Sequence, residues 1–70
     1  FSDEEERAKR MMTALYVYYK NNLDKIPEFY LKRLEIDDVD TVLCDYLSGM
    51  SDMYAVKTFS EIFIPKNWKL

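Results

Sequence analysis

Apolar residues recur at the three-and-four spacing of amphipathic helices in four successive stretches of this chain. The first stretch follows an acidic opening in which Ser2 and Glu5 fit a capping box, and acids suit the first turn of a helix. Asn21 and Asn22, which favour turns, predict where this helix ends. Its apolar stripe consists of Ala8, Met11, Met12, Leu15, Tyr18, Tyr19 and Leu23.

A second, shorter helix and a third helix are predicted next. Pro27 suits the first position of the second helix, with Glu28 beside it in the first turn. Asp37 is the predicted N-cap of the third helix. The apolar residues of the second helix are Phe29, Tyr30, Leu31 and Leu34. Those of the third are Val39, Val42, Leu43, Tyr46, Leu47 and Met50.

A break near Gly49 separates the third helix from a fourth. Gly weakens a helix by about 1 kcal/mol relative to Ala, and a positive φ at Gly49 would make Ala destabilising there. Ser51 is the predicted cap of the fourth helix, with Asp52 in its first turn, and Pro65 stops it. We expect Trp68, in the tail, to fold back or meet a partner. The predicted stripe of this helix is Ala55, Val56, Phe59, Ile62 and Phe63.

The predicted fold is all-α: one domain over residues 1–70, a small bundle of about four helices with a helix-break-helix corner near Gly49. A chain of 70 residues buries only about 60% of its unfolded surface and is marginally stable alone. Yet 49% of its residues are hydrophobic, including six Tyr, four Phe and four Met. Either the core is densely aromatic, or part of this apolar surface faces a partner.

Composition excludes several classes of function. The chain has no His, which removes Ser-His-Asp and Cys-His catalysis and most transition-metal sites. A net charge of −3 and a pI of about 4.8 argue against binding nucleic acid. The sequence features in favour of such binding are limited to scattered cations such as Lys32, Arg33, Lys66 and Lys69. No 18-residue apolar run predicts a membrane span.

Two further features bear on setting and metal binding. The single Cys44 cannot form an internal disulfide, which fits a cytoplasmic protein, and a start at Phe1 fits a fragment or a processed product. The acids at residues 37–40 suggest a calcium loop, but that loop needs Gly at its sixth position and Glu at its twelfth. Val42 and Ser48 stand there, so these acids are assigned to a helix start.

The stretch CDYLSGMSDMYA, residues 44–55, admits two interpretations. From spacing alone it is a corner between helices, with Asp45 on a solvated face. It also closely resembles the "DYIAGMTDRYA"-type signature of bacterial dGTP triphosphohydrolases and related deoxynucleotide triphosphohydrolases. The matching residues are Asp45, Tyr46, Gly49, Met50, Asp52, Tyr54 and Ala55, with Leu47 and Ser51 as close substitutes. ALYVYYKNNLDKIPEFY and KTFSEIF are similar to flanking helices of the family, so that the resemblance covers about residues 8–63.

The resemblance implies that the chain is the C-terminal HD-associated region of such an enzyme. In these enzymes a separate HD domain binds a divalent metal through His and Asp and cuts a deoxynucleoside triphosphate into nucleoside and triphosphate. The chain itself would then hold no metal and no catalytic residue, and its partner would be its own HD domain. It departs from the family at Thr41, where a basic residue is common, and at Met53, where Arg is common.

The signature residues are expected to be structural or to lie near substrate. We expect Asp45 and Asp52 to bond backbone N–H groups or a Tyr hydroxyl at the corner, and so to present Tyr46 and Tyr54 to the HD domain. The alternative is a stand-alone helical module that binds another protein through its Tyr and Met side chains. The same apolar surface could also form a homo-oligomer.

Overall fold

The computed structural model describes residues 3–67 and contains four α-helices and no strand within that range. These are α1 (Asp3–Asn21), α2 (Glu28–Arg33), α3 (Val39–Ser48) and α4 (Asp52–Phe63), with a single 3₁₀ turn, η1 (Leu23–Lys25), before α2. The prediction of a small all-α protein is therefore confirmed. The predicted roles of Ser2 and Trp68 lie outside the described residues.

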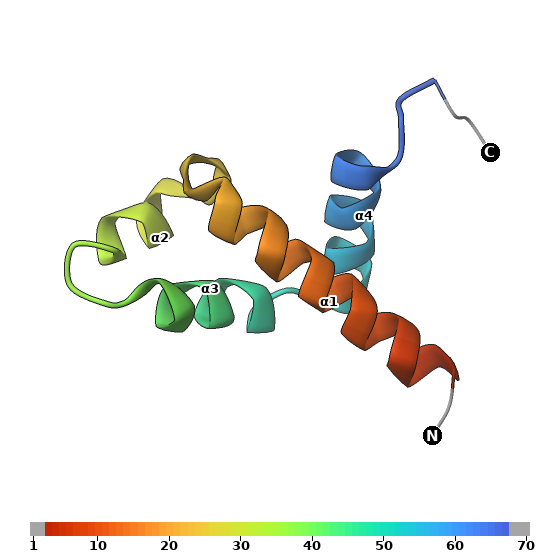
Figure 1. Ribbon diagram of the computed structural model, residues 1–70, viewed down its shortest axis with the longest axis horizontal. Helices are drawn as coiled ribbons and strands as arrows, with labels where there is room; N and C mark the ends of the chain where they lie inside the picture. Colours follow the sequence, from red (N-terminus) through yellow and green to blue (C-terminus); the bar gives the residue numbers. More distant parts are fainter. Residues whose placement is uncertain (1–2, 68–70) are drawn as a thin grey trace.

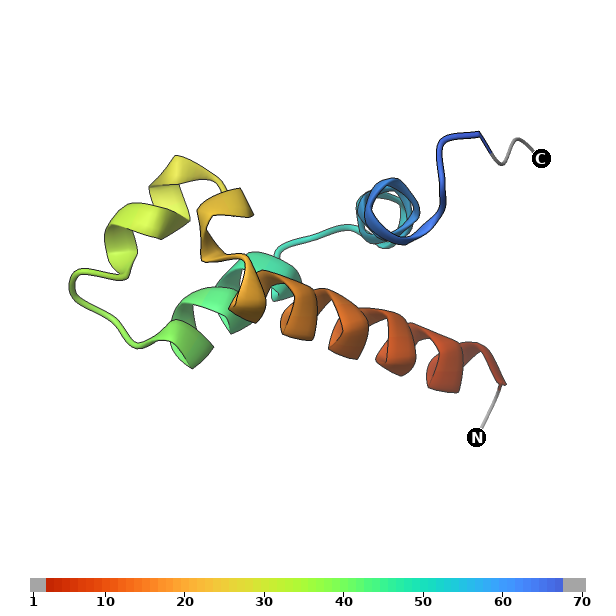
Figure 2. The same ribbon diagram turned by 45° about the horizontal axis from the view of Figure 1, so that its top comes forward.

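The helices are arranged around the contact between α1 and α3 (Figures 1 and 2). η1 and α2 close one end of this pair, and α4 follows α3 at the other end, where it lies across α1. The molecule measures 40 × 34 × 19 Å along its principal axes. The arrangement is thus flat, and several helices contact another helix on one side alone.

The core lies between α1 and α3. Leu15 of α1 and Val42 and Leu43 of α3 are completely buried. Burying such a side chain contributes about 1.5–3 kcal/mol relative to leaving it exposed, so this contact is the main source of stability. The other buried hydrophobic residues are Tyr19, Ile26, Tyr46, Leu47 and Ala55. Polar contacts between α1 and α3 flank the core. The Tyr16 hydroxyl donates a hydrogen bond to the Asp40 carboxylate, and Nζ of Lys20 lies 3.9 Å from the same carboxylate.

The end of α1 agrees with the sequence prediction. α1 ends at Asn21, and the side-chain amides of Asn21 and Asn22 donate hydrogen bonds to the carbonyls of Val17 and Tyr18 (3.1 and 2.8 Å). Tyr18 is among the last four residues of α1, whose carbonyl oxygens have no partner within the helix. The Asn22 side chain therefore caps the carbonyl end of α1.

The segment between α1 and α3 departs from prediction in two details. The helix begins at Glu28 and not at Pro27, whose ψ of 149° is extended and whose carbonyl accepts the first helical hydrogen bonds. The turn η1 was not predicted, because three residues are too few for a periodic pattern. Phe29, predicted to be on the apolar face of this helix, is 70% exposed.

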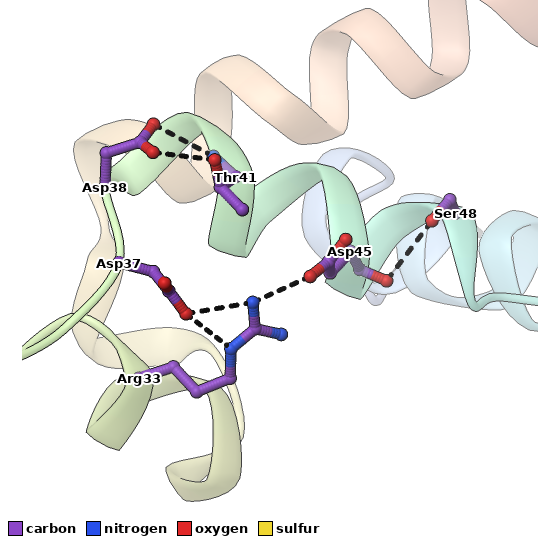
Figure 3. A network of polar contacts seen from close by, with 6 residues as sticks. All are labelled: Arg33, Asp37, Asp38, Thr41, Asp45 and Ser48. Atoms are coloured by element: carbon purple, nitrogen blue, oxygen red, sulfur yellow. Dashed lines mark hydrogen bonds and ion pairs between the residues drawn. The ribbon is translucent and has the colours of Figure 1, made fainter.

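The N-cap of α3 is Asp38, so the prediction of Asp37 was wrong by one residue (Figure 3). One carboxylate oxygen of Asp38 accepts the Thr41 backbone N–H (3.1 Å), and the other accepts the Thr41 hydroxyl (2.6 Å). The hydroxyl, followed by the backbone N–H, holds the pKa of Asp38 below its usual value. Asp37 is unavailable as a cap since its carboxylate binds Arg33 and its N–H donates to the Arg33 carbonyl (2.8 Å).

The corner near Gly49 is present, but its backbone differs from the prediction. Gly49 has φ −81° and ψ −8°, an ordinary right-handed helical conformation, so the predicted positive φ is wrong. α3 ends at Ser48, and the chain turns through Met50 to Ser51, which has an extended backbone. The Ser51 hydroxyl accepts the Tyr54 N–H (3.1 Å), which confirms Ser51 as the cap of α4.

Only part of the predicted apolar stripe of α4 packs against the core. Ala55 is buried, and Phe59 and Ile62 pack against the core, as predicted. Val56 and Phe63 were predicted on the same stripe, yet they are 53% and 44% exposed. α4 meets α1 on one side alone, so the apolar arc is wider than its contact within the chain.

Replacing Gly49 with Ala should stabilise the chain, contrary to the expectation from sequence. The right-handed conformation suits Ala, and an added Cβ would lie 3.4 Å from the nearest atom, the Asp45 carbonyl oxygen, which is ordinary contact. Ala lowers the conformational entropy of the unfolded chain, so we expect the free energy of unfolding to rise by about 0.4–1 kcal/mol. Urea unfolding followed by circular dichroism measures it, and a loss of stability would show that the turn strains Ala.

Replacing Ser51 with Ala should destabilise the chain by about 1 kcal/mol, because the Tyr54 N–H loses its acceptor at the start of α4. Ser48 provides a matched control, since its hydroxyl donates to the Asp45 carbonyl and caps no N–H group. Equal losses from Ser51→Ala and Ser48→Ala in urea unfolding would show that the cap is unimportant.

Candidate functional site

The signature residues lie along the corner, from the second half of α3 to the first turns of α4. Five of the seven predicted site residues line one shallow hollow of about 370 Å³. These are Tyr46, Gly49, Met50, Ser51 and Tyr54, joined by Tyr30 of α2. The other two, Asp45 and Asp52, are on the same segment but do not line this hollow. The signature therefore forms two kinds of surface: an aromatic hollow and separate carboxylates.

Tyr46 forms the inner wall of the hollow and connects three elements. Its ring lies 5.4 Å from that of Tyr19 on α1 and 5.0 Å from that of Tyr30 on α2, between ring centroids. Aromatic pairs at this separation contribute about 0.5–1.5 kcal/mol beyond their buried area. Burial raises the pKa of Tyr46 well above its ordinary value, and a side-chain hydrogen bond with Tyr19 raises it further. Tyr46 is thus a neutral, structural side chain, whereas Tyr54 is half exposed.

Asp45 contacts α2 and not the corner (Figure 3). Its carboxylate lies 2.7 Å from Nη2 of Arg33, and the same nitrogen lies 3.1 Å from the Asp37 carboxylate. The Arg33 Nε–H also donates to Asp37 (3.1 Å). The bonds with Asp45 and then Asp37 raise the pKa of Arg33. The guanidinium therefore joins the end of α2, the following loop and the middle of α3.

Asp52 is exposed at the first position of α4, and its carboxylate has no hydrogen bond or ion pair within residues 3–67. It lines a different hollow, between α1 and α4. The expectation that Asp45 and Asp52 both bond backbone N–H groups or a Tyr hydroxyl at the corner is therefore wrong. Asp45 fixes α2 against α3, and Asp52, in the first turn of α4, is placed to interact with the helix dipole.

Two residues with defined roles were missed by sequence reasoning. Thr41 was noted only as a departure from the family, yet its hydroxyl completes the cap of α3. Arg33 was considered only as a scattered cation. Its spacing of four from Asp37 is a helical ion-pair spacing and could have indicated the first contact. The second contact, with Asp45, joins different helices and has no local signal.

The described residues do not fit a metal site. Within residues 3–67 there is no group of three or more Cys, Asp or Glu side chains close enough to hold an ion. The carboxylates of Asp37 and Asp45 are bound to Arg33, and the Asp38 carboxylate is bound to Thr41. Among these residues no helix is long and apolar enough to cross a membrane.

The structure is a small all-α domain whose signature residues lie at the corner between α3 and α4. The model of the phosphohydrolase-associated domain family matches residues 1–61. Because this match covers most of the 70 residues, the chain belongs to that family. The resemblance noted from residues 44–55 is thereby confirmed. No solved structure matches the chain.

Similar proteins include dGTPase-like proteins that are much longer than this chain. It is 38% identical over 65 residues to a deoxyguanosinetriphosphate triphosphohydrolase-like protein of Caldanaerobacter subterraneus subsp. tengcongensis, covering 93% of this chain and 19% of that protein. Proteins of the same description from Clostridium tetani and Geobacter metallireducens are 38% and 34% identical, over 91% and 84% of this chain and 18% and 15% of theirs. The chain thus corresponds to about a fifth of such proteins.

Removing the guanidinium should cost more stability than removing either of its partners. Arg33→Gln breaks both ion pairs, whereas Asp37→Asn or Asp45→Asn leaves Arg33 with one carboxylate. Lys32→Gln is the matched control, because Lys32 is the neighbouring cation and is exposed. Urea unfolding of the four variants gives the order, and an Arg33→Gln loss no larger than that of Lys32→Gln would contradict the bridge between α2 and α3.

Proposed function

We propose that this chain is the accessory domain of a larger, metal-dependent deoxynucleoside triphosphate triphosphohydrolase. In that reaction water cleaves the ester between the 5′ oxygen and the α-phosphate, which yields a deoxynucleoside and triphosphate. The chain packs against the catalytic HD domain, which holds the divalent metal, and supports it without supplying a reacting group. The protein would work in the cytoplasm.

The observation that carries this proposal is the match over residues 1–61 to a phosphohydrolase-associated family whose similar members are about five times longer than the chain. Three features of the chain are consistent with it. There is no His in the sequence, no metal-binding cluster among the described residues, and no deep pocket at the signature, only a shallow hollow. A supporting role fits these features better than a catalytic one.

The second candidate is a stand-alone module that binds another protein. It is favoured by one specific observation, the large side chains of Phe29, Ile36 and Met53 that are 70%, 89% and 84% exposed. Large apolar side chains with this much exposed surface are typical of contact surfaces. A surface that covers a neighbouring domain of the same polypeptide has the same character, and the family match supports the first candidate.

The full-length protein should hydrolyse deoxynucleoside triphosphates with Mg²⁺ or Mn²⁺, and residues 1–70 alone should not. Triphosphate release and nucleoside formation are measured for each of the four substrates. Deleting residues 1–70 from the full-length protein should lower turnover or thermal stability, because the catalytic domain loses a packed neighbour. The proposal is wrong if the isolated chain is active. It is also wrong if the full-length protein cleaves none of the four substrates with either metal.

A further inference from the structure

α4 presents an apolar surface that no other part of residues 3–67 covers. Met53 and Val56 are 84% and 53% exposed, although the opposite side of the helix carries the buried Ala55. Neither Met53 nor Val56 belongs to the core or packs against it. Large apolar side chains that stabilise nothing within a small domain are typical of a contact surface.

This surface is a groove that extends across two helices. Ala8 and Met11 of α1 and Val56 of α4 form an apolar floor, with Glu4, Arg7 and Asp52 around it, enclosing about 300 Å³. A second hollow of about 320 Å³ is lined by Asp52, Met53, Val56 and Lys57. Asp52 and Val56 line both hollows, so the two form one continuous surface, which we name the α1–α4 groove.

Asp52 adds a negative charge to the groove. It lines both hollows, beside Arg7 in one and Lys57 in the other, yet its carboxylate has no hydrogen bond or ion pair with the described residues. A partner with a cationic side chain there would gain a charge-assisted hydrogen bond, which is shorter and stronger than a neutral one. The groove therefore suits an amphipathic segment with an apolar face and one Lys or Arg directed at Asp52.

We propose that an amphipathic segment of the preceding catalytic part of the same polypeptide occupies the α1–α4 groove. This rests on the proposed function, under which about four-fifths of the protein lies outside this chain, since the chain spans 19% of its relative. Glu4, in the first turn of α1, lines the groove, so the groove lies at the N-terminal end of α1. A segment of the same polypeptide has an effective concentration of about millimolar order.

A second copy of the chain is the competing occupant of the groove. A symmetric dimer places the same patch of both subunits face to face. The groove carries charges of both signs, the acids Glu4 and Asp52 and the cations Arg7 and Lys57. Charge alone therefore does not reject a dimer, and the dependence on protein concentration separates the two occupants. The exposed side chains of Phe29 and Ile36, at the α2 end, lie apart from the groove and beside Lys32, and they serve as an internal reference.

Hydroxyl-radical footprinting of the full-length protein with mass spectrometry tests the proposal. For each side chain, the labelling rate in the native protein is divided by the rate in the urea-unfolded protein, which removes differences in intrinsic reactivity. We expect Met53 to be labelled severalfold more slowly in the native protein. A native rate close to the unfolded rate, as its exposure in this chain alone implies, overturns the proposal.

Two variants and a dilution identify the occupant. Val56→Asp should release Met53 to nearly the unfolded labelling rate, whereas Ile36→Asp, an equal change at an exposed residue outside the groove, should leave Met53 protected. Protection should persist from micromolar to nanomolar protein, because the segment belongs to the same polypeptide. Loss of protection on dilution assigns the groove to a second copy and overturns the proposal. Protection that survives Val56→Asp also overturns it.

The same preparations separate this proposal from the proposed function. Hydrolysis of deoxynucleoside triphosphates by a protein in which Met53 is fully labelled rejects the occupied groove and retains the function. A protected Met53 in a protein that cleaves none of these substrates rejects the function, while the covered groove stands.

Discussion

The packing of Leu15 against Val42 and Leu43 is the contact on which the rest of the structure depends. These three side chains are completely buried, and they hold the longest helix against the helix that carries the first half of the signature. The other elements attach to this pair. Tyr46 and the Arg33 ion pairs fix α2 to α3, and Ala55 and Phe59 fix α4 to the opposite end. Losing the α1–α3 contact would leave no element with a sufficient partner.

A core of this size leaves much apolar surface without a neighbour. A domain of about 70 residues is marginal, because its surface is large relative to its volume. In this chain the uncovered surface is concentrated on α4 and at the α2 end, in side chains such as Met53 and Ile36. An independent protein would carry this surface as an aggregation hazard, whereas a domain covered by its neighbour would use it as an interface. Membership of a phosphohydrolase-associated family agrees with the second interpretation.

Sequence reasoning succeeded where the physical cause is local. Apolar periodicity identified all four helices within the described residues, and the hydroxyl of Ser51 identified the start of α4. It failed where the cause lies between elements. Asp38 caps α3 because Arg33 occupies Asp37, and the bond from Arg33 to Asp45 joins two helices. The sequence identified the signature residues along the chain through the family resemblance, and their role as a site stays a prediction. The division of these residues into a hollow around Tyr46 and a separate Asp52 was not predictable, since it depends on how α3 and α4 diverge after Gly49.

Native-state hydrogen exchange along the whole chain most directly tests whether stability resides in the α1–α3 contact. If stability resides in this contact, the amides of Leu15 and Leu43 exchange only on global unfolding, with the free energy and denaturant dependence of global unfolding. Amides of α4 from Val56 to Ile62 exchange through a local opening of lower free energy, because that helix is packed on one side. If the α4 amides instead share the full unfolding free energy of Leu43, α4 is an equal part of the core, and the view of an incomplete domain built on α1 and α3 is wrong.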